Sequence, residues 1–595
     1  MIKRLAPVGL ILAVACGGGG DGGGTGPITK PNDISSMAVG DVRVLNPADI
    51  TNGIDLPAGS GARDYVIIVG NTASIKDAEV SYVVRADKSS GATFGISAPS
   101  DLGASSAMLV GQVPLARTRQ QAVENRVRAF ERRGLTMKSA PDMLGGSRLS
   151  ARRSAQATAM AIPNVGDVIN LKIPDANTNN LCNNFIPIQA VVASVSNKAI
   201  LVVDTLDGPP LTLFTPAQMD SITTEFDNVT YPTDAAYFNT PTDIDGNGRI
   251  IMLFSGHINE LTPPNTQGGF VGGFFFAGDF FPPTDTPQAQ GCASTNQAEI
   301  FYLLSPDPTG RFGNIRTASS VRQGTRGTIA HEFQHMINAG KRFENPQVDA
   351  FEATWLDEAL AHFAEDAVGR VARGFGDLES LDFGKILPCN TPCREANDFN
   401  AFFFQNLARL TYWMQEPNKF SPLSKDADTS LAVRGAAWAI LRYAADNYSS
   451  GAPRTFTRAL VAGPDTGLKN FNAATKAPID TVVAGWLVSM FADNFTPAIA
   501  GINAKYQYAS YNFRSVMGPV ARSVLGNQTI VYPLTVTPIG SGGDNFLATN
   551  RSGTGTYYRL VVAAGAGAKN VKVLDSSGTN PATFVGLHVY VLRLQ

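Results

Sequence analysis

The sequence has little charge, and neither sign dominates. Of its 595 residues only 16% are charged, and 48 Lys and Arg against 50 Asp and Glu leave a net charge of -2. A chain without a cationic excess lacks the field that gathers nucleic acid, so we expect no nucleic-acid partner. The hydrophobic fraction of 44% is typical of a folded globular protein and excludes a collagenous, coiled-coil or disordered chain.

The apolar stretch at the start of the chain is short. Residues 5–15 follow Lys3 and Arg4 and are too few to cross a bilayer. With the small residues before Cys16, this segment resembles a bacterial lipoprotein signal, although an ordinary secretory signal remains the alternative. We expect a signal peptide over residues 1–15 and a Gly-rich tether over 16–35. The protein would be exported and lipid-anchored through Cys16 at the outer membrane or cell surface, or released from there.

Cysteine is scarce, with five residues in the chain. Beyond Cys16 there are four, an even number that favours two disulfides in an exported protein. The close pair Cys389 and Cys393 would leave Cys182 to bond Cys292, although four cysteines allow three pairings. A zinc knuckle would need a second close pair.

The length exceeds what one hydrophobic core supports, so we expect an α+β multidomain protein. Short β-branched runs between turn residues predict three β-modules: an N-terminal β-sandwich (36–114), a small module (161–210) and a C-terminal β-domain (505–595). Residues 115–160 are rich in Lys and Arg and contain a helical stretch. We interpret them as a solvated linker, with a cleaved prosegment or a contact with an anionic membrane as alternatives.

Three of the five histidines lie between positions 331 and 362. His331, Glu332 and His335 form a HExxH motif. On a helix, residues four apart share a face, so both imidazoles can reach one metal ion while Glu332 lies beside it. Gly340 is suited to end this helix. The alternative is a helix with two surface histidines.

A second helix, expected over residues 355–368, supplies a third ligand. Thr354 and Asp357 can form a capping box at its start. Glu358 lies 23 residues after His335, far enough for a loop and an antiparallel return. Two His and one Glu leave the fourth position of a tetrahedral zinc open, as in catalytic sites.

The segments HEFQHMIN and WLDEALAHFAED resemble the gluzincin class of zinc metallopeptidases, and within it the hyicolysin-like family. The resemblance covers residues 215–493, including 241–249 and 296–302. It implies a zincin-like metallopeptidase domain, which we place at residues 211–500. In zincins the strand before the HExxH helix offers its edge to an extended peptide, and the resemblance places that edge at residues 299–304.

The resemblance also implies one catalytic zinc, held by His331, His335 and Glu358, and a water activated with Glu332 as general base. The metzincin pattern does not fit. His362 stays open as a third ligand. It stands where thermolysin-like relatives have Asp, so the carboxylate that orients each ligand histidine is left open among Glu365, Asp366 and Asp357.

The group that stabilises the oxyanion is not fixed by the sequence. Arg434 stands where many gluzincins have Tyr, and Tyr443 and Tyr412 are the other candidates. Residues 268–281 form either a flexible flap over the substrate or a buried strand.

Residues 243–254 match the first half of a calcium loop. Asp243, Asp245 and Asn247 supply oxygens at the first, third and fifth positions, but Phe254 replaces the final Glu. A partial calcium site and a simple turn both remain open.

We therefore expect a zinc endopeptidase that cleaves extracellular or envelope proteins. The alternatives are an inactive binding or adhesion lipoprotein on a peptidase scaffold and a zinc hydrolase of a non-peptide substrate. The sequence predicts protein or peptide substrates and membrane contact only through the lipid anchor, and it leaves the oligomeric state open.

Overall fold

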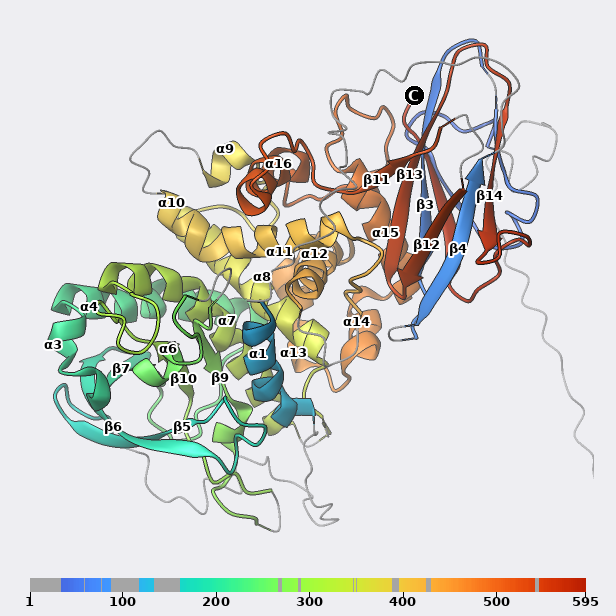
Figure 1. Ribbon diagram of the computed structural model, residues 1–595. Helices are drawn as coiled ribbons and strands as arrows, with labels where there is room; N and C mark the ends of the chain where they lie inside the picture. Colours follow the sequence, from blue (N-terminus) through green and yellow to red (C-terminus); the bar gives the residue numbers. More distant parts are fainter. Residues whose placement is uncertain are drawn as a thin grey trace, which may run out of the picture.

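The computed structural model describes residues 34–57, 59–75, 78–86, 117–132, 161–265, 270–286, 290–345, 347–348, 350–387, 395–423, 430–540 and 545–595. They form a mixed α and β protein with a β-sandwich at one end and a larger part that holds a six-stranded sheet and the helices (Figure 1). The expected signal and tether up to residue 33, Cys389 and Cys393 lie outside the described residues.

The β-sandwich is built from both ends of the described chain. One sheet has the order β1-β15-β3-β13-β11 and the other β12-β4-β14-β2. Strand β3 (Arg63–Asn71) pairs antiparallel with both β13 (Thr554–Val562) and β15 (Leu587–Arg593). The prediction of two separate β-domains at residues 36–114 and 505–595 is therefore wrong, because their strands alternate within shared sheets. The other strands are β1 (Val42–Leu45), β2 (Ile54–Leu56), β4 (Glu79–Ala86), β11 (Val536–Pro538), β12 (Asn545–Arg551) and β14 (Lys569–Asp575).

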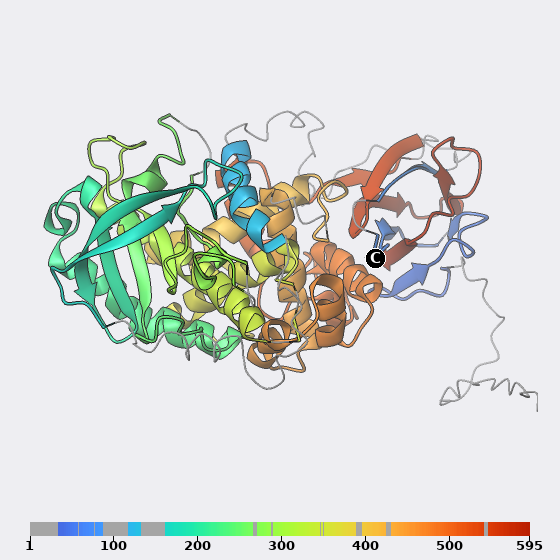
Figure 2. The same cartoon turned by 90° about the horizontal axis from the view of Figure 1, so that it is seen from below.

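Strand β3 is buried on both faces. Tyr65 and Ile67 point into the core between the two sheets, whereas Val66 and Ile68 belong to the core of the larger part. Because neighbouring side chains on a strand point to opposite faces, one strand joins both cores. Helix α15 (Ile479–Ala492) packs against this outer face, and the helices coloured yellow to orange lie between the sandwich and the six-stranded sheet (Figure 2).

The six-stranded sheet has the order β5-β6-β7-β8-β10-β9. Strands β7 (Ala199–Asp204), β8 (Ile250–Ser255) and β10 (Ile300–Leu304) run parallel, and β9 (Gly273–Phe275) pairs antiparallel with β10 at the edge. The prediction of a separate β-module at residues 161–210 is wrong, because β7 pairs directly with β8. The first two strands are β5 (Val168–Pro174) and β6 (Phe185–Val195).

Strand β10 is not the edge that the sequence predicted at residues 299–304. Both its sides are paired, and β9 takes the edge position. Of the two interpretations of residues 268–281, the structure favours the buried strand, since Phe274 and Phe275 are buried. A disulfide joins Cys182 to Cys292, as predicted.

The two motif-bearing helices are α7 (Ala318–Glu344) and α8 (Thr354–Arg373), which pack against each other. Gly340 does not end α7 but lies inside it, where an added Cβ would come within 2.8 Å of Thr242. The predicted capping box of α8 is also wrong, because Ala353 is the N-cap and no side chain caps the helix.

Among the described residues, none of the helices combines the length and apolar character needed to cross a bilayer. The remaining helical segments are α3 (Pro210–Leu213), α4 (Pro216–Glu225), α5 (Tyr231–Phe238), α6 (Gly256–Asn259), α9 (Phe383–Ile386), α10 (Glu395–Asp398), α11 (Phe404–Gln415), α12 (Leu431–Tyr448), α13 (Pro453–Ala462), α14 (Gly467–Thr475), α16 (Phe513–Leu525), η1 (Thr205–Asp207), η2 (Phe226–Thr230), η3 (Ala277–Phe280), η4 (Phe399–Phe403) and η5 (Ala504–Tyr506).

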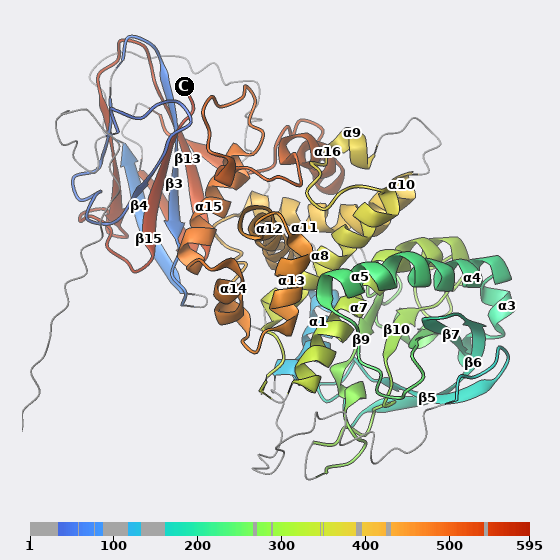
Figure 3. The same cartoon turned by 180° about the vertical axis from the view of Figure 1, so that it is seen from behind.

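Helix α1 (Arg117–Arg132) is the described part of the segment predicted as a solvated linker at residues 115–160. It packs against β9 and η3, and Val123 and Val127 are buried in the core of the larger part. For these residues the linker interpretation is wrong. Figures 1 and 3 show α1 between the six-stranded sheet and the helices, close to α7.

Candidate metal centre

Helix α7 turns both motif histidines to one side. His331 and His335 are one helical turn apart, and their Nε2 atoms lie 3.1 Å from each other. The opposite side of the helix is held by the buried side chains of Phe333, Met336 and Ile337. The core therefore fixes the rotation of α7 that brings the two imidazoles together.

Helix α8 brings Glu358 to the same point. Its Oε2 atom lies 3.4 Å from His331 Nε2, and its Oε1 atom lies 3.9 Å from His335 Nε2. Four ligands about 2.1 Å from a tetrahedral zinc lie about 3.4 Å from one another. Two imidazoles and one carboxylate are ligands that zinc takes, so these three residues fit the ion in number, type and spacing.

A carboxylate faces the outer nitrogen of each histidine. Glu365 Oε1 lies 2.8 Å from His331 Nδ1, and Asp357 Oδ2 lies 2.7 Å from His335 Nδ1. Such partners hold the rings so that Nε2 is directed at a metal. Of the three carboxylates predicted for this role, Asp366 takes no part, because it contacts Arg370, Arg442 and Tyr511.

The site carries ionised carboxylates. Burial alone would raise the pKa of Glu358, but Arg434 and His331 outweigh it and hold this pKa well below its usual range. Burial likewise opposes ionisation of Glu365, yet its contacts with His362 and His331 lower its pKa. For His331, burial lowers the pKa, but bonding to Glu358 and Glu365 raises it to about 9. Without a metal, therefore, a proton on His331 supplies part of the positive charge that the site requires.

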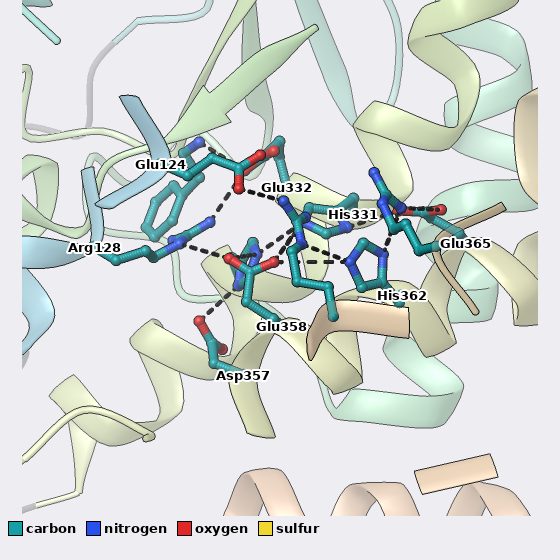
Figure 4. A network of polar contacts seen from close by, with 12 residues as sticks. Glu124, Arg128, His331, Glu332, Asp357, Glu358, His362 and Glu365 are labelled. Atoms are coloured by element: carbon teal, nitrogen blue, oxygen red, sulfur yellow. Dashed lines mark hydrogen bonds and ion pairs between the residues drawn. The ribbon is translucent and has the colours of Figure 1, made fainter. Parts of the chain in front are cut away.

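His362 is next to the site, with its Nε2 atom 4.0 Å from Glu358 Oε2. Its Nε2 atom accepts a hydrogen bond from Arg434 Nε at 2.9 Å, and its Nδ1 atom lies 2.9 Å from Glu365. Burial, followed by Arg409 and Arg434, lowers its pKa well below the usual value. His331, His362 and Glu365 also come close together. Glu358 approaches the Nε2 atoms of both motif histidines, whereas the nitrogens of His362 face Glu365 and Arg434, so the geometry favours Glu358 as the third ligand (Figure 4).

Glu332 is positioned by the edge strand. Its Oε2 atom accepts a hydrogen bond from the backbone N–H of Phe275, at 2.8 Å. A cavity of about 410 Å³ opens beside it and is also lined by His331 and Glu358. A reacting group in this cavity would touch the base and the metal ligands together.

Of the three candidates for stabilising the oxyanion, the structure places two beside the metal ligands and one elsewhere. Arg434 and Tyr412 line the cavity beside the ligands. Arg434 is buried and lies 2.8 Å from Glu358. Tyr443 is wrong for this role, because its hydroxyl donates to the carbonyl of Lys505 in another part of the molecule.

The predicted calcium loop is a tight turn closed by its own hydrogen bonds. The backbone N–H of Gly248 donates to Asp243, and both the backbone and side chain of Asn247 donate to Asp245. Glu299 joins the two aspartates from the start of β10. Gly248 has φ +69°, which a glycine adopts without strain.

Sequence reasoning missed two charged residues of α1. Arg128 lies 3.6 Å from Glu332 and 3.4 Å from Glu358, and Glu124 pairs with Arg434. The spacing of Val123, Val127 and Phe130, at i, i+4 and i+7, was the available sign that this basic helix has a buried face.

Comparison with known proteins gives one informative similarity. Over 151 residues the chain is 31% identical to the "Neutral metalloprotease ShpI" of Staphylococcus hyicus. The aligned part is 25% of this chain and 31% of that protein, so the chain spans about a third of its relative's length. No protein-family model matches the chain. The similarity supports a metalloprotease relationship, and the buried His and Glu side chains could hold a metal ion.

Proposed function

We propose that this protein is a zinc-dependent endopeptidase whose site is formed by His331, His335, Glu358 and Glu332. The observation that carries the proposal is the convergence of two imidazole nitrogens and one carboxylate at 3.1–3.9 Å, with a carboxylate behind each imidazole. The distant similarity to a neutral metalloprotease supports the same reaction class.

Bound zinc would act as a Lewis acid that polarises the scissile carbonyl and acidifies a water molecule. Glu332, held by the N–H of Phe275, takes a proton from the attacking water and later gives it to the departing amine nitrogen. Arg434 Nη2 lies 3.3 Å from His331 Nε2, so its guanidinium can donate to negative charge that develops on the substrate oxygen.

The proposed substrates are extracellular or envelope proteins, in line with the expected export signal and lipid anchor at Cys16. An extended peptide would lie along β9, because β9 ends the sheet and its Phe275 touches the base.

The test compares casein hydrolysis and zinc content of the chain with those of Glu332→Ala. Loss of the base should lower hydrolysis by about 10²- to 10⁴-fold. Zinc content should stay near one ion per chain, because Glu332 is not a ligand. Glu344→Ala, on the surface end of the same helix, is the matched control and should change neither quantity.

Hydrolysis that is measurable and equal in the chain and in Glu332→Ala would exclude this residue as the base. Folded protein that takes up no zinc would contradict the metal site and favour a binding function.

A further inference from the structure

Helix α1 lies beside the candidate metal centre and contacts Glu332, Glu358 and Arg434. Residues of α1 line the 410 Å³ cavity together with His331, Glu332 and Glu358. In Figure 4, Arg128 reaches from α1 toward Glu332 and Glu358. The helix therefore forms one wall of the cavity and narrows the space that is open to a substrate.

The contacts of α1 are charge-complementary to the site. The Arg128 guanidinium lies 3.4 Å from Glu358 and 3.6 Å from Glu332, so a cation already faces a proposed metal ligand and the proposed base. The carboxylate of Glu124 pairs with Arg434, the candidate donor to the oxyanion. Thus α1 presents positive charge where the metal is needed and negative charge where the oxyanion would form.

The apolar side chains of α1 hold the helix against the candidate metal centre. Val123 and Val127 are buried, and the ring of Phe130 lies 5.3 Å from Phe276 and 5.1 Å from Phe281. Both aromatic partners follow β9, the proposed peptide-binding edge. Since α1 packs against β9, a peptide added to the edge of β9 would collide with it.

We propose that α1 is an internal inhibitor of the site, which competes through Arg128 with the metal and through its bulk with the peptide. The inference rests on the proposed function, because it assigns a regulator to that same site. Hydrolysis then requires α1 to leave the cavity, and any change that loosens α1 activates the protein.

The first test measures zinc affinity of the full chain by competition with a chromophoric chelator. Arg128→Ala removes the competing cation, so zinc should bind at least about tenfold more tightly. Arg126→Ala is the matched control: it removes the same charge from the same helix, and the contact recorded for Arg126 within the described residues is a hydrogen bond to the carbonyl of Ala176, away from the metal ligands. Its zinc affinity should stay within about twofold of the parent.

The second test loosens α1 without changing any charge. Phe130→Ala removes the aromatic anchor and keeps Arg128 in the chain. Zinc affinity and casein hydrolysis should both rise, the hydrolysis by at least about tenfold. In the Phe130→Ala/Glu332→Ala double variant the hydrolysis should disappear while the zinc affinity stays raised.

These readouts separate the inference from the proposed function. Tighter zinc binding by Arg128→Ala and Phe130→Ala without any hydrolysis would support the inhibitor and contradict the peptidase. Unchanged zinc affinity in Arg128→Ala, with hydrolysis equal to that of the parent, would overturn the inhibitor. If Phe130→Ala no longer unfolds cooperatively, the comparison of Arg128→Ala with Arg126→Ala tests the inhibitor alone. Tighter zinc binding by Arg128→Ala than by Arg126→Ala supports it, and equal zinc affinity overturns it.

Discussion

Among the described residues, two of the groups of potential metal ligands in the larger part of the molecule differ in their partners. The cluster of His331, His335 and Glu358 is faced by the guanidinium groups of Arg128 and Arg434. The cluster of Asp243, Asp245 and Glu299 is instead satisfied by neutral donors from its own loop and its surroundings. Positive charge therefore faces the first cluster, whereas neutral N–H and O–H groups donate to the carboxylates of the second.

The same difference is visible in the ionisation of the carboxylates. Arg434 and His331 overcome the effect of burial on Glu358 and keep its pKa low, whereas burial raises the pKa of Glu299 to about 8 and that of Asp245 to about 6. Suitable residue types at the spacing of a metal site are therefore not enough to predict that a metal binds. A metal site also needs charged ligands whose lone pairs meet at one point.

The largest effect is expected from Glu358→Ala. It removes one of the three proposed zinc ligands, so zinc affinity should fall by more than the roughly 100-fold that loss of an outer partner causes. Equilibrium dialysis against a chelator measures this loss. Zinc-replete, active Glu358→Ala would show that His362 or another group is the third ligand.

Asp357→Ala should have the next largest effect. Asp357 orients His335 from 2.7 Å, and loss of such a partner lowers metal affinity about 10- to 100-fold. Asp357→Asn keeps an oxygen that can accept the Nδ1 hydrogen, so it should retain more of the affinity. Equal zinc affinity in Asp357→Ala and the parent would contradict this role.

A smaller effect concerns the pH dependence of stability. Glu299 titrates near 4.5 when unfolded and near 8 when folded, so it stabilises the fold at low pH and loses this contribution as pH rises from about 4.5 to 8. Glu299→Gln stays neutral. In urea unfolding, the parent should lose more stability than Glu299→Gln between pH 5 and 8, and parallel curves would refute the raised pKa.

The smallest effect is expected from calcium. Because the turn at residues 243–248 is closed by its own hydrogen bonds, millimolar calcium should shift the melting temperature by less than about 2 °C. A larger shift that disappears in Asp245→Ala would assign a calcium site there after all.

Much of the metal centre is predictable from sequence because its geometry is local. The spacing of His331 and His335 fixes their common face on a helix, and Glu358 follows from a second amphipathic helix. The helix expected over residues 355–368 lies within α8, since hydrophobic periodicity encodes it, and the strand expected at residues 299–304 corresponds to β10.

Contacts between distant segments were not predictable in this way. Nothing in residues 63–71 specifies that their partners lie near residue 590, and the two ends of the chain were therefore assigned to different domains. The position of Arg128 beside the candidate metal centre could not be predicted from the sequence for a similar reason. A helix rich in Arg is usually solvated, and only the docked position shows that this side chain is buried beside Glu332 and Glu358.

The interleaved sandwich has a consequence for biosynthesis. Strand β3 is made early, but its neighbours β13 and β15 leave the ribosome only after the six-stranded sheet and helices α7 to α16 have been translated. The nascent chain must carry β3 unpaired through that time. A premature stop codon before residue 587 would remove β15, the neighbour of both β1 and β3, and expose two strand edges to aggregation.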